Sequence, residues 1–174
     1  MEKQSIQFLF AENELILNVG DLLSAPTEVI VNPANGGLSH GGGLAEQILQ
    51  EAGDKLRQEC DQLIHEQGQL NSGMAVYTSA GRLPYKAIVH AVGPKMGEGE
   101  EKEKIEQVVT NSLQLCEENK WSSIAFPAIS TGIFCVNGEV CAHGFFNAIA
   151  SFWQGDSSAT SLKKIMIYLS ENHL

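Results

Sequence analysis

The sequence predicts an α/β fold: a three-layer α/β/α sandwich around a mixed, largely parallel central sheet. Two observations predict it. Short apolar runs typical of buried strands alternate along the chain with segments whose apolar residues recur every three to four positions, as on one face of a helix. Helices that alternate with strands cover both faces of a sheet of this kind. With 174 residues and 43% hydrophobic residues, residues 1–174 suit one globular domain.

Each predicted strand is an apolar run bounded by turn residues. The first two flank the polar turn Ala11–Asn13, and the third precedes the turn cluster Asn32–Gly37. The fourth and fifth flank the turn Gly81–Pro84, and the sixth ends in the loop Pro127–Asn137. The predicted strands are residues 6–10, 14–19, 29–31, 74–79, 87–92, 124–126 and 165–169.

The predicted helices follow from apolar residues at helical spacing. The first such segment runs from Leu44 to Ile64, and Gly53 is expected to break it. The second begins at Ile105, after a charge run at residues 98–104 that suits a solvated loop and helix start. The third covers residues 141–152. The chain stops soon after the last predicted strand, which suits a module excised from a longer chain.

The charge balance limits the kinds of ligand. Eleven lysines and arginines stand against 21 acidic residues, a net charge of −10, and only Arg57 and Arg82 are arginines. Such a chain lacks the basic surface that duplex DNA or an anionic membrane would require. A phosphorylated ligand would therefore have to be held by backbone N–H groups.

Three loops follow predicted strands, where ligands bind in open α/β sheets. They are Gly20–Leu23, the glycine-rich Asn32–Gly43, and Ala128–Phe134. Glycines let the backbone approach a ligand closely, and the following helix N-terminus adds partial positive charge. Two such loops facing each other would form a cradle for a diphosphate. The sequence contains neither the P-loop motif nor the Rossmann glycine motif.

Taken in order, four motifs resemble those of one family. VGDL, VIVNPANGGLSHGGGLA, HAVGP and IAFPAISTGIF are similar to the corresponding segments of macrodomains, the binding modules for ADP-ribose. The resemblance runs from about Ile6 to Leu169. The form LSHGGGLA is most similar to macrodomains of viral polyproteins and of proteins related to poly-ADP-ribose polymerases.

The resemblance implies a role for several residues. Asp21 would accept a hydrogen bond from the adenine amino group, and the Leu22 backbone would contact the base. Asn35 would hydrogen-bond the distal ribose, and His40 would lie along that ribose and the proximal phosphate. The amides of Ser130–Phe134 would wrap the diphosphate, with the phenylalanine near the distal ribose. The implied ligand-binding set is Asp21, Leu22, Asn35, Gly41, Gly42, Gly43, Leu44, Ser130, Thr131, Gly132, Ile133 and Phe134.

The residues themselves also allow purely structural roles. Asp21 is compatible with the cap of a turn, and His40 with a solvated loop histidine. Asn32 and Asn35 suit left-handed turn positions, and Phe134 suits an apolar anchor of its loop.

Metal chemistry is not expected. His90 lies in an apolar strand, which favours a core histidine with satisfied hydrogen bonds. The four cysteines are widely spaced, form no CxxC pair and are expected to be reduced. The zinc-dependent macrodomains carry clustered cysteine and histidine around the glycine-rich loop, and no cysteine of this chain falls there. The resemblance therefore implies neither a metal nor a cofactor, only the ligand ADP-ribose.

The resemblance leaves open whether the protein is an enzyme or a reader that only binds ADP-ribose. One group of hydrolases carries an aspartate two positions after the last glycine of its loop, where this chain has Ala45. The viral-like group instead carries three residues found here as Asn35, His40 and Phe134, which would be catalytic. The activity implied is hydrolysis of mono-ADP-ribose from modified acidic side chains, and the alternative is a reader without catalysis.

Partners and location are expectations of the same kind. The implied partners are ADP-ribose and mono-ADP-ribosylated proteins, with no membrane and no nucleic acid. A monomeric module is expected, since the sequence shows no unexplained apolar stripe that would require a partner. The reduced cysteines favour the cytoplasm or the nucleus.

Overall fold

The computed structural model describes residues 5–154 and 160–170. Its core is one mixed sheet of seven strands in the order β1-β2-β7-β6-β3-β5-β4. The strands are β1 (Ser5–Phe10), β2 (Asn13–Val19), β3 (Val29–Ala34), β4 (Ala75–Thr78), β5 (Ala87–Val92), β6 (Ser123–Pro127) and β7 (Lys164–Leu169). The helices are the short 3-10 turn η1 (Leu22–Ser24) and the α-helices α1 (Gly43–Ala52), α2 (Asp54–Gln67), α3 (Glu101–Glu118) and α4 (Gly138–Trp153).

The five inner strands are parallel, and each edge strand is antiparallel to its neighbour. β2, β7, β6, β3 and β5 pair in parallel, whereas β1 pairs antiparallel with β2 and β4 with β5. The carboxyl ends of the five parallel strands therefore meet at one edge of the sheet, where ligands bind in folds of this type.

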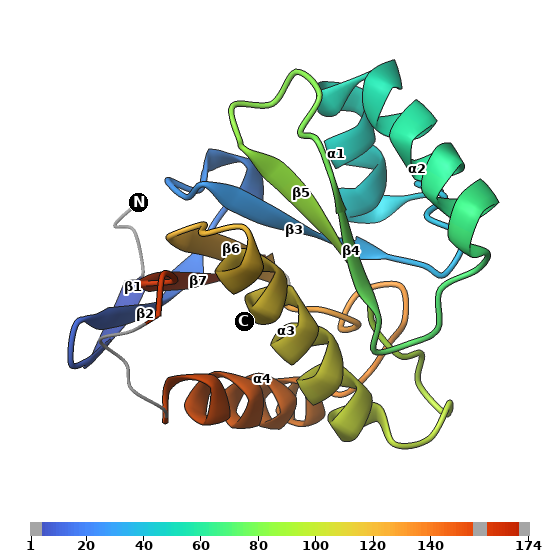
Figure 1. Cartoon of the computed structure of the whole chain (residues 1–174). Coiled ribbons are helices and arrows are strands. Elements are labelled where there is room, and N and C mark those ends of the chain that lie inside the picture. The colour runs from blue at the N-terminus through green and yellow to red at the C-terminus, as the bar shows by residue number, and fades with distance from the viewer. Residues whose placement is uncertain (1–4, 155–159, 171–174) are drawn as a thin grey trace.

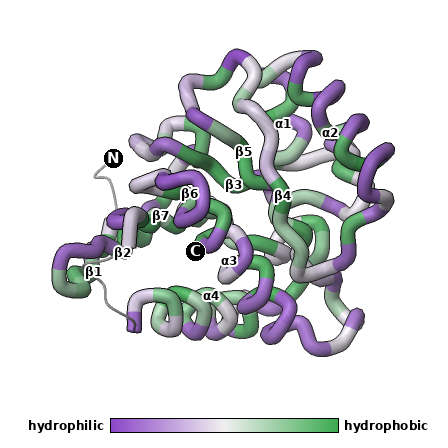
Figure 2. Tube along the Cα trace, viewed as in Figure 1, coloured by the Kyte–Doolittle hydropathy of each residue, from purple (hydrophilic) through white to green (hydrophobic). Residues whose placement is uncertain are grey.

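Helices cover both faces of the sheet, α1 and α2 on one and α3 and α4 on the other (Figure 1). Successive residues of a strand point to opposite faces. Val29 and Val31 accordingly pack with the α3 and α4 cluster, and Ile30 packs with the α1 and α2 cluster. Figure 2 shows hydrophobic residues along the central strands, and hydrophilic and hydrophobic residues alternating along α2 and α3. The predicted three-layer sandwich is confirmed.

β3 is longer than its sequence predicted. It continues through Asn32 and Pro33 to Ala34, so Asn32 is a buried strand residue and its predicted left-handed turn conformation is wrong. The whole of β3 pairs with β5, but β6 pairs only with Val29 and Ile30. Proline is tolerated in the second half of β3 because one side of that half has no neighbouring strand to bond.

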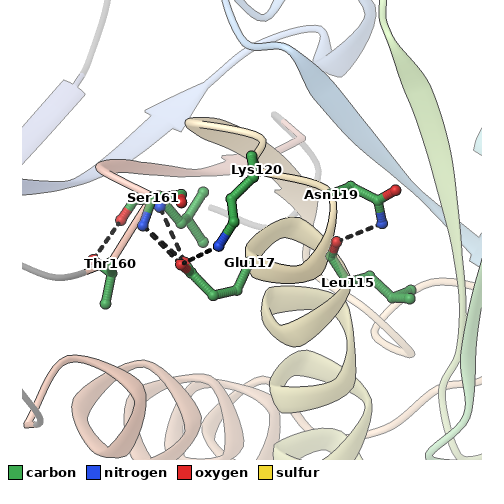
Figure 3. Close-up of polar contacts among 7 residues, drawn as sticks. Leu115, Glu117, Asn119, Lys120, Thr160 and Ser161 are labelled. Atoms are coloured by element: carbon green, nitrogen blue, oxygen red, sulfur yellow. Dashed lines mark hydrogen bonds and ion pairs between the residues drawn. The ribbon is translucent and has the colours of Figure 1, made fainter.

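A carboxylate joins the end of α3 to the segment before β7. The Glu117 side chain accepts hydrogen bonds from the Ser161 N–H at 2.9 Å and the Leu162 N–H at 3.3 Å, and Lys120 Nζ lies 3.7 Å away (Figure 3). Leu162 is fully buried beside this contact. The contact fixes where the chain enters β7, whose far end reaches the candidate site.

The edge strand β1 differs from expectation. Its apolar side chains Ile6, Phe8, Leu9 and Phe10 are all at least 44% exposed, so the sheet does carry an apolar stripe at this edge. The expected monomeric state stays a prediction.

The cysteines form no disulfide. All four are free, and burial raises the thiol pKa of Cys60, Cys116 and Cys141 to about 12. In the part of the chain that the structure describes, no helix is both long and apolar enough to cross a membrane.

Candidate functional site

A cavity of about 980 Å³ lies at the carboxyl edge of the parallel strands. Its walls come from the loops after β2, β3 and β6 and from the ends of β5 and β7. Every residue of the predicted ligand-binding set lines this cavity. The three loops that the sequence singled out therefore meet at one place, although their individual contacts with a ligand stay predictions.

The loop after β2 brings a carboxylate to the cavity. Asp21 Oδ1 accepts a hydrogen bond from the Leu23 N–H at 2.9 Å and so caps η1. The structural role that the sequence allowed is therefore present, and the same side chain lines the cavity. Asp21 Oδ2 has no hydrogen-bond partner among the described residues, which leaves one carboxylate oxygen for a ligand.

The glycine-rich loop is closed by the Asn35 amide. Its Nδ2 donates to the Ser39 carbonyl at 2.8 Å, and its Oδ1 accepts from the Ser39 N–H at 3.1 Å. Leu38, at φ +50°, takes the left-handed conformation that the sequence allowed for Asn35. Gly36 is required by close approach, since a Cβ there would lie 2.3 Å from the Leu70 carbonyl oxygen. These contacts fix the loop in front of α1.

The first turn of α1 presents free N–H groups to the cavity. Gly42 precedes the helix and provides no side-chain cap. The N–H groups of Gly43, Leu44 and Ala45 have no acceptor among the described residues, and all three residues line the cavity. An uncapped helix N-terminus carries unsatisfied donors and partial positive charge, which together favour an anion.

The loop between β6 and α4 supplies a second set of donors. Within the described chain, no acceptor takes the N–H groups of Gly132, Ile133 and Phe134. The Ile133 Cδ1 lies 3.5 and 3.6 Å from the positions that a Cβ would occupy on Gly43 and Gly42. The two loops thus approach each other closely, with backbone donors on both, as a diphosphate cradle requires.

A close contact between the residue after β5 and this loop explains why that residue, Gly93, is a glycine. A Cβ on Gly93 would lie 2.2 Å from Ser130 Oγ and 2.5 Å from Ile129 Cγ2. Ser130 has a left-handed φ of +67°, and its buried hydroxyl makes no hydrogen bond among the described residues. Gly93 therefore allows the loop to take a conformation that a side chain would block.

The comparisons with known proteins decide the family. The model of the Macro domain matches residues 31–145, about two thirds of the chain. The chain belongs to the macrodomain family. It is 44% identical over 131 residues to an uncharacterised protein of Sulfurisphaera tokodaii, covering 75% of this chain and 71% of that protein.

Other relatives of this macrodomain carry functional names. It is 41% identical to the O-acetyl-ADP-ribose deacetylase of Citrobacter koseri over 135 residues, 76% of each chain. It is 38% identical over 157 residues to human protein mono-ADP-ribosyltransferase PARP14, covering 88% of this chain but only 9% of that protein. The Oceanobacillus iheyensis macrodomain with ADP superposes with a TM-score of 0.91 at 30% identity, covering 99% of this chain and 92% of that one.

One predicted catalytic residue of the macrodomain does not reach the cavity. His40 is absent from the cavity wall, and its Nε2 is buried without a hydrogen-bond partner among the described residues. Its ring lies edge-on to that of His90, with centroids 6.0 Å apart. Burial lowers the pKa of the His40 ring, and the charge of Arg57 lowers it by a smaller amount. His40 thus packs against the core histidine, and its predicted contact with a ligand stays a prediction.

His90 is the core histidine that the sequence predicted. It is fully buried in β5, with Nδ1 3.0 Å from Asn32 Nδ2 and Nε2 2.9 Å from Thr78 Oγ1. Burial, followed by the nearby His40, lowers its pKa to about 3, so the ring is neutral. Its two ring nitrogens are both used in this network.

A group of possible metal ligands lies behind the cavity. His40, Cys60 and His90 offer ligand atoms within 4.8 Å of one another, the one such group in the described residues. A metal at His90 Nε2 would have to displace the Thr78 hydroxyl. The donor set therefore fits a buried hydrogen-bond network better than a metal centre, and no step of the chemistry below passes through it.

Several cavity residues lie outside the predicted ligand-binding set. The sequence left open which residue within 168–172 would be an aromatic that stacks on adenine. Tyr168, the residue before the last one of β7, pairs with Asn18 of β2, is only 5% exposed and lines the cavity, whereas residues 171 and 172 lie outside the described residues. Gly93 was visible within HAVGP, but its close approach to Ser130 was not. Further lining residues lie in the three predicted loops but outside the predicted ligand-binding set: Gly20, Pro33, Ala34, Ser39, Ala128 and Ile129. The remaining lining residues, beyond those loops, are Ala45, Gln47, Ala91, Pro127 and Ser170.

Proposed function

We propose that this macrodomain binds ADP-ribose and hydrolyses mono-ADP-ribose from modified acidic side chains of proteins. The observation that carries the binding proposal is the pair of facing backbone-donor arrays, at the N-terminus of α1 and in the β6–α4 loop. They supply donors for a diphosphate in a chain of net charge −10. The likeness to a macrodomain with ADP and to O-acetyl-ADP-ribose deacetylases supports the same ligand class.

The lining residues give ADP-ribose a proposed orientation in the cavity. Asp21 Oδ2 accepts a hydrogen bond from the adenine amino group, and the Leu22 backbone and Tyr168 flank the base. These residues are placed at the adenine end because they lie together at the ends of β2 and β7. The diphosphate lies between the two donor arrays. Asn35 and Phe134 then face the distal ribose, whose C1″ carries the modified side chain.

The proposed chemistry relies on positioning more than on a strong general base. Asp21 is the only carboxylate on the described wall of the cavity, and it belongs to the proposed adenine end. Water attacks at C1″ or at the ester carbonyl, the bond to the distal ribose or to the acyl carbon breaks, and ADP-ribose leaves beside a free carboxylate. The substrate's own diphosphate, held by fixed amides, positions the water. Phe134 shapes the space for it.

Asn35 and His40 act in different ways in this proposal. Asn35 lines the cavity and also holds the Ser39 turn, so it orients both the distal ribose and the loop beside it. His40 packs on His90 behind the loop and is a positioning residue. The direct contact with substrate predicted from the sequence is not part of the proposal, because His40 does not line the cavity.

A reader without catalysis is the second candidate, and Ala45 favours it. Ala45 lines the cavity at the place where one group of hydrolases has an aspartate, so no acid from α1 assists the reaction. A reader would recruit its host protein to ADP-ribosylated targets. The proposed cytoplasmic or nuclear location serves either function.

Calorimetric titration separates binding from chemistry. The proposal expects one ADP-ribose per chain, bound more tightly than AMP, because AMP lacks the second phosphate that the facing amides hold. AMP binding as tightly as ADP-ribose would contradict the diphosphate cradle. Release of ADP-ribose from a protein modified on glutamate then distinguishes the hydrolase from the reader.

A further inference from the structure

A second chamber, of about 450 Å³, adjoins the proposed distal-ribose end of the main cavity. The two share Asn35, Gly93 and Phe134, and the first and last of these are the residues placed beside the distal ribose above. Whatever is bonded to C1″ therefore faces this second chamber. No residue of the adenine end lines it.

The second chamber is too large for a small acyl group. An acetyl group is about the size of two water molecules, each of which occupies roughly 30 Å³ in the liquid. A space of about 450 Å³ falls in the range of pockets that enclose whole small ligands. Its size suits a side chain together with part of its peptide backbone.

The chamber carries one cation that is not neutralised. Lys104 Nζ pairs with Glu98 Oε1 at 3.0 Å. Hydrogen bonds to Glu98, first from the Lys95 N–H and second from the Ser72 side chain, lower the pKa of Glu98 to about 2. Glu98 therefore stays ionised and neutralises Lys104. Lys95 Nζ has no ion pair among the described residues and stands 5.6 Å from the centroid of the Phe134 ring.

We propose that the second chamber is a subsite for the peptide that bears the ADP-ribosyl group, and that Lys95 selects acidic residues flanking the modified one. This inference rests on the proposed function, since it requires ADP-ribose in the main cavity. Its basis is that the two cavities share Asn35 and Phe134 in their walls, the size of the second, and the unpaired Lys95 ammonium group beside the Phe134 ring. The reaction is unchanged, and Lys95 acts on binding of the peptide.

Equilibrium binding tests the inference without any need for turnover. The probes are free ADP-ribose and two peptides that carry ADP-ribose through a non-hydrolysable linkage, one with acidic flanking residues and one with neutral ones. The wild type is expected to bind the acidic peptide most tightly. Lys95→Ala is expected to weaken binding of the acidic peptide about two- to fivefold, as for an exposed ion pair, with ADP-ribose affinity within about twofold of wild type. Lys95→Glu is expected to weaken it further.

A matched control separates a local effect from net charge. Lys55→Ala removes the same charge from the exposed outer side of α2, where Lys55 faces Glu59, and is expected to leave all three affinities unchanged. Added salt should reduce the preference for the acidic peptide.

Three results would overturn the inference. One is an equal loss of affinity for the acidic peptide and for free ADP-ribose in Lys95→Ala, which would place the effect of the lysine in the main cavity. Another is no preference of the wild type for the acidic peptide. The third is tighter binding of a two-unit ADP-ribose chain than of the acidic peptide, which would assign the chamber to a second ADP-ribose. Failure of the proposed function looks different: ADP-ribose itself would not bind, or the acidic peptide would bind without being hydrolysed when ester-linked.

Discussion

At the scale of single residues, Asn35 has two roles that its sequence position does not separate. Its amide makes two hydrogen bonds to the Ser39 backbone, and its side chain lines the cavity. The sequence resemblance predicted only the second role. It could not predict the first, because the geometry of the turn depends on Leu38 taking a left-handed conformation.

We expect Asn35→Ala to slow release of ADP-ribose from glutamate-modified protein about tenfold to a hundredfold, because a small displacement of the reacting groups costs a factor of this order. Affinity for free ADP-ribose should fall much less. Ser39→Ala is the comparison, because it removes the hydroxyl that accepts from Asn35 Nδ2 at 2.9 Å but keeps the backbone bonds with Asn35. Rate constants from single-turnover assays and calorimetric affinities provide the comparison. Equal losses of rate and affinity would remove the catalytic role of Asn35.

Gly93→Ala should destabilise the fold and weaken ADP-ribose binding. The new Cβ would meet Ser130 Oγ at 2.2 Å and Ile129 Cγ2 at 2.5 Å, so the loop between β6 and α4 would have to move. Overpacking of this kind costs about 1–3 kcal/mol of the free energy of unfolding. Gly138→Ala, where a Cβ would meet nothing within 4 Å, should leave both properties near wild type. Chemical denaturation and calorimetry measure the two quantities, and wild-type behaviour of Gly93→Ala would show that the contact is not restrictive.

The direction of the His40 side chain is a feature at this scale that the sequence did not contain. The place of His40 before three glycines suggested contact with a ligand, but the ring turns into the interior toward His90. Side-chain direction in a loop is set by tertiary packing, here the buried network of β3, β4 and β5 around His90. No spacing rule in the sequence contains that information.

At the scale of elements, most strands and helices follow from their apolar spacing. The break predicted at Gly53 separates α1 from α2, and the charge run at residues 98–104 contains the start of α3. β3 is the exception, because pairing with β5 extends it past the residues that predicted a turn. Local turn propensity was overridden there by the neighbouring strand.

The N-terminus of α1 and the β6–α4 loop lead to a prediction about salt. If backbone N–H groups hold the diphosphate, few mobile cationic side chains contribute, and added salt has little long-range attraction to screen. The dissociation constant of ADP-ribose should change less than about threefold between low and high salt, whereas binding to a lysine-rich surface would weaken by orders of magnitude. Titration at several salt concentrations measures it. A steep salt dependence would contradict the backbone cradle.

At the scale of the whole molecule, buried histidines couple the fold to pH. His90 has a pKa of about 3 in the folded protein against an ordinary 6.5. Between these values the unfolded chain binds a proton that the folded chain does not, so the free energy of unfolding falls as the pH decreases below 6.5. The contribution is fully present above about pH 6.5 and is lost progressively toward pH 3.

Thermal unfolding between about pH 7 and pH 5 separates the histidines from Glu98, whose contribution to stability is lost only below its ordinary pKa of 4.5. Burial also lowers the pKa of His40, so a His90 variant is needed to separate the two histidines. We expect the midpoint temperature of the wild type to fall over this range. His90→Gln should be less stable at pH 7, since it loses the contacts with Asn32 and Thr78, but its midpoint should depend less on pH. Parallel pH profiles of the two proteins would contradict the assignment.

The net charge of the molecule also accounts for the use of backbone donors in the proposed site. With a net charge of −10, the chain as a whole repels a diphosphate, and the proposed diphosphate site at the carboxyl edge of the sheet relies on backbone donors. The sequence predicted this edge and its loops. It did not predict the second chamber, which depends on how the segment after β5 folds back toward the glycine-rich loop.

The measurement that tests the central claim most directly is a time course of ADP-ribose release from a protein mono-ADP-ribosylated on glutamate. The account predicts that catalytic amounts of the wild-type macrodomain release ADP-ribose and that Asn35→Ala releases it more slowly. Tight binding of ADP-ribose with no release above the buffer control would contradict hydrolysis and make this chain a reader.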